Sequence, residues 1–427
     1  MAASDSCDVL VIGGGPAGAT VATLVAARGH RVLVAERSGE PQFKIGESLM
    51  PATYWTLKRL GMLEKMRASS FPKKYSVQFY SRDGHASKPF YFFENDPHES
   101  SQTWQVLRSR FDQMLLDNAV EKGAELRRGL AVSDLIFDNG RAVGAEVVAG
   151  DGTRGRIAAR VVVDATGQSA FLARRLGMLE VEPQMRHVSF FSHFRGAVRD
   201  PGIDEGATLV INSSTGKSWF WYIPLPDDVV SVGVVGPVDY LIKGRAGDPA
   251  AVFAEELAAT PALQPRIAGA EQLFPIRAQR DFSYRARQIA GDGWVIVGDA
   301  FGFIDPIYST GVLLALKAGE MAADAIHDGL ERGDLSGEQL GRFGLEFTAG
   351  MESLRRLVYA YYVEGFSFAQ FLRAHPHCRR DLITLLTGNL YREPLGDLFA
   401  RLGEMVELPA AAPFDPPTVA TGAGRAT

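Results

Sequence analysis

Three glycines near the amino terminus have the spacing of a phosphate-binding loop. Gly13, Gly15 and Gly18 form G-x-G-x-x-G directly after the apolar run CDVLVI at 7–12. Such glycines allow a tight turn, let the backbone approach a pyrophosphate, and let the next helix pack close. Glu36 closes the following apolar run, where a carboxylate can accept hydrogen bonds from ribose hydroxyls. The spacing therefore predicts a dinucleotide site, to which we also assign the flanking residues Pro16, Ala17 and Arg37.

A second acidic residue far along the chain favours FAD over NAD. Asp299 ends the apolar run WVIVGDA at 294–300, and a helix is expected to begin near 309–311. An aspartate there can bind the ribityl chain, and the positive end of the helix can stabilise the anion of reduced flavin. An NAD domain needs no such second segment. We include Gly302 in this predicted FAD site.

The segment KSWFWYIP at 217–224 gathers two of the five tryptophans. In an extended strand Trp219, Trp221 and Ile223 share one face, and Phe220 and Tyr222 share the other. Both faces are apolar, so on its own the segment indicates a strand covered on both sides.

The elements around these residues predict a mixed α/β chain. The run 7–36 is a strand–helix–strand unit, 124–167 has the pattern of a β-meander, and 186–240 is rich in β-forming residues. We therefore expect a Rossmann-like FAD-binding domain with a parallel sheet, an antiparallel substrate domain and a helical C-terminal region. The expected bounds are 1–75, 105–175 and 280–340 for the FAD domain, 76–104 and 176–279 for the substrate domain, 341–409 for the helices, and 410–427 for a disordered tail.

Composition gives no support for several classes of partner. Apolar residues make up 46% of the 427 residues, charged residues 22%, and the formal net charge is −5. This balance gives no electrostatic reason to expect nucleic acid or an anionic membrane. The amino terminus lacks a basic segment, no apolar run reaches membrane-spanning length, and Cys7 and Cys378 are the only cysteines. We expect a cytoplasmic protein.

Two further motifs resemble segments of a known group of proteins. The resemblance as a whole covers about residues 7–345. QVLRSRFD at 105–112 is similar to a segment of the glutathione-reductase-like FAD proteins, and the resemblance makes Arg108 the flavin-contacting arginine. That group includes aromatic monooxygenases, geranylgeranyl reductases and flavin-dependent halogenases. DATG, from Asp164 to Gly167, resembles the version in halogenases and reductases, and both residues are expected at the cofactor. Hydroxylases that reduce their own flavin usually carry Asp-Gly there, so a separate flavin reductase, or another electron donor, is expected to supply the electrons.

Within that group the tryptophan segment is similar to the W-x-W-x-I-P signature of flavin-dependent halogenases. The resemblance implies that Trp219 and Trp221 form a wall that keeps the organic substrate away from the flavin. PQFKIGESLMPAT at 41–53 looks like a family segment that brings Glu47 and Ser48 to the cofactor. FPKKYSVQF at 71–79 resembles F-x-x-K-x-G and assigns the catalytic lysine to Lys74, with Lys73 as the alternative because serine replaces the glycine.

The chemistry implied is halogenation through hypohalous acid. Reduced flavin, O2 and chloride or bromide give the oxidant, and a buried lysine can hydrogen-bond it, polarise it or become a chloramine. DPIYSTG at 305–311 resembles the family's D-P-x-x-S-T/S-G loop, which suggests halide binding at Thr310 and Gly311 and a catalytic role for Ser309. Tyr308 stands where tryptophan halogenases carry glutamate. This difference points to a phenol or pyrrole substrate, either free or tethered to a carrier protein.

The same residues are compatible with other functions. A related monooxygenase or polyprenyl reductase without halide activity is the main alternative, and a flavin-binding sensor or electron carrier is another. The aromatic segment 357–371 either covers a substrate entrance or packs in a helical core. His375, His377 and Cys378 fit no standard zinc spacing, so no metal site is expected.

Overall fold

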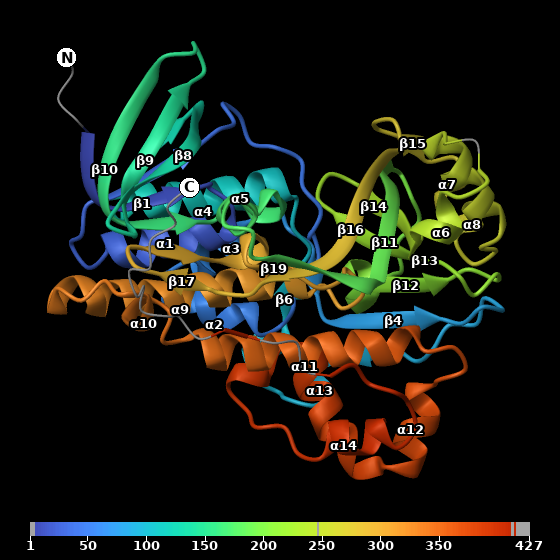
Figure 1. Cartoon of the computed structure of the whole chain (residues 1–427). Helices are drawn as coiled ribbons and strands as arrows, with labels where there is room; N and C mark the ends of the chain where they lie inside the picture. Colours follow the sequence, from blue (N-terminus) through green and yellow to red (C-terminus); the bar gives the residue numbers. More distant parts are fainter. Residues whose placement is uncertain (1–4, 246, 411–413, 416–427) are drawn as a thin grey trace.

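The computed structural model describes residues 5–245, 247–410 and 414–415, and Figure 1 shows their arrangement. Two sheets lie side by side, and a group of C-terminal helices lies beneath them (Figure 1). The predicted mixed α/β class, with a parallel sheet, an antiparallel sheet and a helical C-terminal region, is confirmed.

The first sheet carries the predicted nucleotide-binding unit. Its central order is β17-β18-β10-β1-β2-β7, and β1 pairs in parallel with both β10 and β2. Strands covered on both faces are continuous apolar runs, as CDVLVI and RVVVD are. Because these two strands are parallel neighbours, with Ile12 opposite Asp164, they end at the same edge of the sheet. The strands are β1 (Asp5–Ile12), β2 (Val32–Glu36), β7 (Glu125–Arg128), β8 (Leu130–Asp138), β9 (Arg141–Ala149), β10 (Arg154–Asp164), β17 (Ala290–Gly291) and β18 (Trp294–Ile296).

The second sheet is largely antiparallel, with the order β19-β16-β11-β14-β13-β12-β4-β5. Its strands are β4 (Ser76–Tyr80), β5 (Phe90–Tyr91), β11 (Leu179–Arg195), β12 (Thr208–Asn212), β13 (Trp219–Leu225), β14 (Val229–Pro237), β15 (Glu271–Gln272), β16 (Arg277–Ala286) and β19 (Gly302–Phe303). A separate pair joins β3 (Lys73–Lys74) to β6 (Thr103–Trp104). The predicted domain bound at 280 falls inside β16, and β19 leaves the nucleotide-binding segment to pair with it.

The helices cover both sheets and form the C-terminal layer (Figure 1). They are α1 (Pro16–Ala26), α2 (Thr53–Arg59), α3 (Leu63–Ala68), α4 (Arg108–Glu121), α5 (Phe171–Arg175), α6 (Val238–Leu241), α7 (Pro249–Ala258), α8 (Gln264–Ile267), α9 (Thr310–Arg332), α10 (Gly337–Leu340), α11 (Gly344–Tyr362), α12 (Phe368–Ala374), α13 (Arg379–Thr387) and α14 (Leu398–Gly403). Among the described residues, none of these helices has the length and apolarity needed to cross a bilayer.

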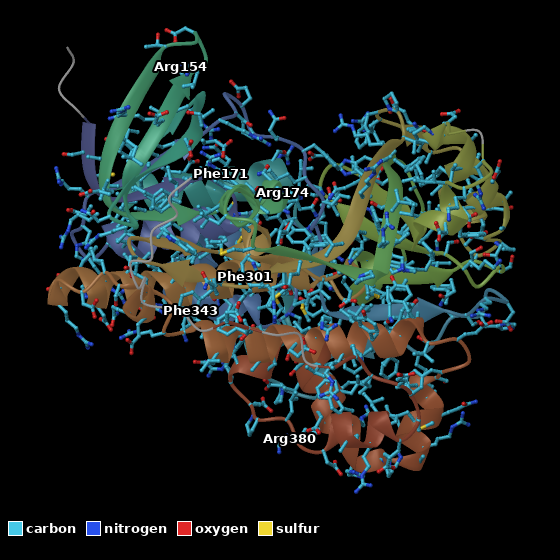
Figure 2. The ribbon with its side chains drawn as sticks, in the orientation of Figure 1. Arg154, Phe171, Arg174, Phe301, Phe343 and Arg380 are labelled. Atoms are coloured by element: carbon cyan, nitrogen blue, oxygen red, sulfur yellow. The ribbon has the colours of Figure 1, made fainter. Side chains whose placement is uncertain are left out.

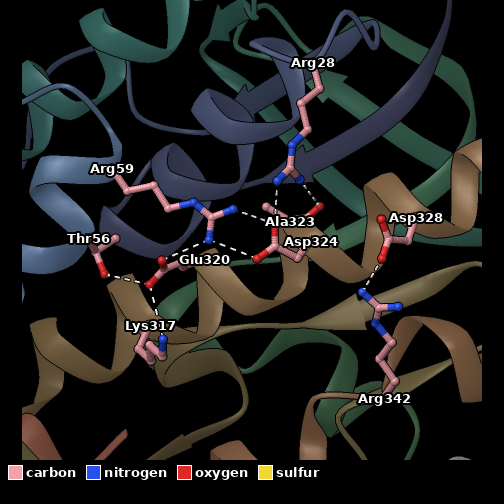
Figure 3. Close-up of polar contacts among 9 residues, drawn as sticks. All are labelled: Arg28, Thr56, Arg59, Lys317, Glu320, Ala323, Asp324, Asp328 and Arg342. Carbon is pink, nitrogen blue, oxygen red and sulfur yellow. Dashed lines mark hydrogen bonds and ion pairs between the residues drawn. The ribbon is translucent and has the colours of Figure 1, made fainter. Parts of the chain in front are cut away.

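Charged side chains fix the long helix α9 from outside (Figure 3). Arg59 of α2 reaches Glu320 at 2.9 Å and Asp324 at 2.5 Å, and Arg28 also bonds Asp324, at 2.6 Å. Single exposed ion pairs contribute little, so the value of this group lies in joining α2 and the end of α1 to one helix.

Apolar packing joins α9, α11 and the first sheet. Figure 2 shows Phe301 and Phe343 inside the ribbon, whereas Arg154 and Arg380 reach its outer edges.

Of the predicted disordered tail 410–427, only 410, 414 and 415 are described, and the rest lies outside the described residues. Phe414 lies against Phe301, with ring centroids 6.5 Å apart, and Asp415 N donates to the Arg287 carbonyl. Cys7 and Cys378 are buried and unpaired.

Gly18 provides a test of how closely α1 must approach β1. A Cβ atom there would lie 2.1 Å from the Gly13 carbonyl oxygen, so Gly18→Val forces the helix away and costs at least about 1–3 kcal/mol. At Gly15 the nearest described atom would be Lys44 Nζ at 3.9 Å, and its φ of −72° suits any residue. Thermal unfolding should show a fall of several degrees for Gly18→Val and little change for Gly15→Ala. Equal melting temperatures would contradict this packing argument.

Candidate active site

A cavity of about 820 Å³ lies where the two sheets meet. The edge of the first sheet contributes Ile12 and Ala35, and the second sheet contributes Val210 and Gln279. This volume is in the range of cofactor pockets. The predicted site residues that line the cavity are Gly13, Gly15, Pro16, Ala17, Glu36, Arg37, Glu47, Ser48, Arg108, Gly167, Trp219, Trp221, Asp299, Ser309 and Gly311.

The glycine loop and Glu36 form one corner of the cavity. Gly13 has φ +100°, and a Cβ on it would lie 2.6 Å from the Ala165 carbonyl oxygen, so only glycine fits between β1 and β10. Glu36 accepts hydrogen bonds from Gly14 N at 2.7 Å and Ser38 N at 2.9 Å. These bonds hold the carboxylate at the end of β2, beside the amino terminus of α1.

Arg108 stands at the start of α4 in a buried ion pair. Its guanidinium binds Asp112 at 2.8 Å and 3.0 Å and also donates to the Ile45 carbonyl. Gly46 has φ +102°, and a Cβ on it would meet Arg108 Nη1 at 2.7 Å. The glycine of the G-E-S segment thus leaves room for the arginine beside the cavity.

Asp299 lies in the short 3-10 turn η5 (Gly298–Ala300) and faces the cavity. Burial raises the pKa of its carboxyl to about 6, although the cations Arg108 and Lys44 act in the opposite direction. A carboxyl that is costly to ionise in a closed site gains from a hydroxyl partner.

Three predicted cofactor residues lie outside the cavity lining. Asp164 accepts from Thr166 N at 3.0 Å and Leu172 N at 2.7 Å, so its buried carboxyl holds the turn after β10. Gly302 packs against Met351, whose Cε would lie 2.7 Å from a Cβ atom. Gly18 packs on Gly13. These residues shape the walls around the cavity, and the cofactor contacts assigned to them remain predictions.

The tryptophan strand β13 has the alternation that its sequence predicts. Trp219, Trp221 and Ile223 line the cavity, whereas Phe220 and Tyr222 pack in the separate core of the second sheet. Trp221 Nε1 donates to Ser231 Oγ at 3.0 Å. Gly233 makes room for the indole, because a Cβ there would lie 2.2 Å from the Trp221 ring.

Lys74 is buried and Lys73 is exposed, which separates the two candidate lysines. Lys74 Nζ donates to Ser48 Oγ at 2.9 Å and to the Leu49 carbonyl at 3.1 Å, and it lies 5.5 Å from the centre of the Phe92 ring. Burial lowers the pKa of Lys74 to about 7. Since Ser48 lines the cavity, the amine lies one hydrogen bond away from it.

The loop before α9 closes another side of the site. Ser309 caps the helix with φ +57°, an uncommon conformation for a residue other than glycine. Thr310 is the buried first residue of α9 and does not line the cavity, whereas a Cβ on Gly311 would meet no heavy atom of the described residues within 4 Å. Tyr308 is buried, and burial raises the pKa of its hydroxyl.

The sequence-based prediction gave no individual role to His187, His193, Asp305, Tyr362 or Lys44, whereas it placed Glu47 at the cofactor. Glu47 pairs with His193 at 2.8 Å, and Asp305 pairs with His187 at 3.0 Å. The two histidines share one face of β11 by strict alternation, which was the available signal. Tyr362, from the aromatic segment at the end of α11, also reaches Asp305. Lys44, in the segment 41–53, brings its Nζ to 3.9 Å from where a Cβ atom on Gly15 would lie.

Two groups of metal-ligand types occur among the described residues, both outside this cavity. They are His30, His327 and Glu331, and His377, Cys378 and Asp397. In the second group burial raises the pKa of the Cys378 thiol, and Asp397 already binds Arg401 at 2.9 Å. A protonated thiol is a poor metal ligand.

The lining residues fit FAD. The amino termini of α1 and α9 both reach the cavity through glycines, Gly15 and Gly311, whose missing side chains leave open space in front of the backbone. Helix amino termini attract phosphate and anionic groups, and Arg108 and Lys44 add cationic side chains. Glu36 and Asp299 supply acceptors for hydroxyl groups.

Comparisons with known proteins agree with this geometry. The family model described as FAD binding domain matches residues 6–319. The 1H-pyrrole-2-carbonyl-(peptidyl-carrier protein) brominase of Pseudoalteromonas luteoviolacea is 36% identical over 332 residues, which are 77% of this chain and 79% of that protein. The corresponding chlorinase of Pseudomonas fluorescens is 30% identical over an alignment that covers 96% of this chain and 94% of that protein.

A solved structure extends the likeness to almost the whole fold. The flavin-dependent brominase Bmp2 has a TM-score of 0.84 and 30% identity, with 94% of this chain and 98% of that chain covered. An FAD cavity, the matching domain and relatives of this length and identity lead to one conclusion. This chain belongs to the flavin-dependent halogenase family and is an FAD-dependent oxidoreductase.

Proposed function

We propose that this chain halogenates a pyrrole ring tethered to a carrier protein, with chloride or bromide as the halide source. The names of two relatives state that substrate, and each relative aligns with at least three quarters of this chain. Tyr308, in place of an acidic residue, supports a ring that needs no carboxylate to activate it. A phenolic ring is the alternative substrate of the same chemistry.

The observation that carries the proposal is the buried amine of Lys74 beside the cavity. Reduced FAD, which the glycine loop, Arg108 and Asp299 would hold, would together with O2 supply the two-electron oxidation of halide to hypohalous acid. A pKa of about 7 lets Lys74 exist in both protonation states near neutral pH. The ammonium can hold hypohalous acid by hydrogen bonding. The neutral amine can take its halogen, while the amine proton and the hydroxide leave as water. The ring then takes the halogen and returns a proton to nitrogen.

Two other groups of residues act in this proposal. Trp219, Trp221 and Ile223 present apolar surface to the cavity. This surface keeps water and the aromatic substrate away from the part of the cavity that binds the flavin. Backbone N–H groups at Thr310 and Gly311 bind the halide at the start of α9, because a helix amino terminus attracts anions. The Ser309 N–H donates to the Pro306 carbonyl at 3.0 Å and closes the turn that presents them.

A separate flavin reductase supplies the reduced cofactor in this proposal. The chain has one glycine-rich nucleotide motif, at Gly13–Gly18, and that motif is assigned to FAD. Two dinucleotides would ordinarily need two such sites.

The substrate proposal can be tested by direct turnover. The protein is supplied with FAD, a flavin reductase, NADH, O2 and bromide or chloride, together with either pyrrole-2-carbonyl-loaded carrier protein or free pyrrole-2-carboxylate. Mass spectrometry should show halogen on the carrier-bound ring and much less on the free acid. Hydroxylated product would favour a monooxygenase, and turnover of the free acid alone would rule out the carrier-bound substrate.

Lys74→Met should lower the yield of halogenated product at least about a hundredfold, because the group that holds the oxidant is gone. Methionine fills a similar volume, so bound FAD, measured by its visible absorbance, should not change. Lys73→Met is the matched control, since this exposed neighbour lies on the same strand. A Lys74→Met protein that halogenates as fast as the wild type would remove the lysine from the mechanism.

The depressed pKa of Lys74 also predicts a pH dependence of stability. The unfolded chain keeps this amine protonated up to about pH 10.5, whereas the folded chain releases the proton near pH 7. Between these values the unfolded state binds more protons. The wild type should therefore gain unfolding free energy over Lys74→Met by about 1.4 kcal/mol per pH unit. Urea unfolding of both proteins from pH 6 to 9.5 measures this difference, which should be flat below pH 7. A constant difference throughout would mean that the folded amine has an ordinary pKa.

A further inference from the structure

The hydroxyl of Tyr362 joins two walls of the active site. Trp219 Nε1 donates to it at 3.0 Å, and the hydroxyl lies 3.2 Å from Asp305 Oδ1 and 3.3 Å from Oδ2. Asp305 also accepts from Ile307 N at 2.9 Å and bonds His187 Nδ1 at 3.0 Å. The Tyr362 and His187 rings lie with centroids 4.4 Å apart. Three segments of the chain therefore meet at the Asp305 carboxylate, and Trp219 is joined to it through the Tyr362 hydroxyl.

The direction of these hydrogen bonds is fixed by chemistry. An indole N–H can only donate, so the Tyr362 oxygen accepts from Trp219 and its own proton points to Asp305. Burial and the Asp305 charge raise the pKa of the Tyr362 hydroxyl, so it keeps that proton. The two hydrogen bonds from Trp219 to Tyr362 and from Tyr362 to Asp305 therefore run in one direction only. Phenylalanine at 362 would remove both of them.

Both ends of this chain belong to the cavity. Trp219 is part of the tryptophan wall, and Asp305 begins the loop that leads to α9. That loop contains Ser309 in a left-handed conformation, which persists only where neighbouring contacts hold the backbone. Asp305 supplies such contacts through Ile307 N. The hydroxyl of Tyr362 thus holds the wall and the halide loop at one separation.

We propose that Tyr362 is a positioning residue for halogenation, through which helix α11 of the C-terminal region completes the active site. This inference rests on the proposed function. Without the hydroxyl, the Trp219 indole and the loop at 305–309 can move independently. Oxidant formed between them would then reach water more often than the lysine or the ring. The protein would still consume O2 but would halogenate fewer substrate molecules for each O2.

Tyr362→Phe tests the hydroxyl alone. Halogenated product per O2 consumed should fall at least about fivefold, because both hydrogen bonds of the hydroxyl are lost, and the halide KM should rise. Bound FAD should stay the same. Tyr361→Phe is the matched control, because this neighbouring tyrosine on the same helix bonds Asn212 Oδ1 at 3.2 Å and should keep the wild-type coupling.

A readout independent of turnover identifies Trp219 as the partner. Quenching of tryptophan emission by bromide in the purified protein should differ between the wild type and Tyr362→Phe. In a Trp219→Phe background the same change at 362 should have no further effect. Wild type that makes no halogenated product defeats the proposed function, while the quenching result can still stand. Wild-type coupling and quenching in Tyr362→Phe, or equal losses in Tyr361→Phe, would overturn the positioning role.

Discussion

The close contact between α1 and α9 is the constraint on which the site depends. A Cβ on Gly319 of α9 would lie 2.7 Å from the Ala17 carbonyl oxygen and 2.9 Å from Thr20 Cβ, so the helix backbones touch. Gly298 is similarly pressed against Ala17 and Ala315. Because the two helices are this close, both of their amino termini reach one cavity. The positive ends of two helix dipoles then act on the same ligand.

Strand alternation supplies the opposite wall. Trp219, Trp221 and Ile223 face the cavity, and the residues between them build the core of the second sheet. The same strand therefore serves both stability and chemistry, with a strict division between its faces. On β11, His187 and His193 reach the buried acids Asp305 and Glu47 by the same rule. Polar groups of the second sheet are thus matched to carboxylates contributed by segments of the nucleotide-binding part.

Local sequence patterns predicted the parts of the site that depend on local geometry. The glycine loop, Glu36 at the end of its strand and the two faces of β13 follow from spacing alone. Lys74 was distinguished from Lys73 by resemblance, and burial now supports that choice. The structural roles of Asp164 and Gly302 could not be predicted from the sequence, because each role depends on which segment packs against the residue. The contact of Asp305 with His187 and Tyr362 joins residues that are far apart in the sequence. Their spacing along the chain therefore does not predict it.

The buried tyrosines have a consequence for an enzyme that makes an electrophilic halogen. Burial, with added repulsion from Asp305, raises the pKa values of Tyr308, Tyr361 and Tyr362, so their hydroxyls stay un-ionised. A neutral phenol reacts with electrophiles far more slowly than a phenolate. The hydroxyls of Tyr361 and Tyr362 are also engaged by Asn212 and Asp305. The same burial that packs these rings around the site therefore protects them from the electrophilic halogen produced nearby. The enzyme thus avoids halogenating its own tyrosines.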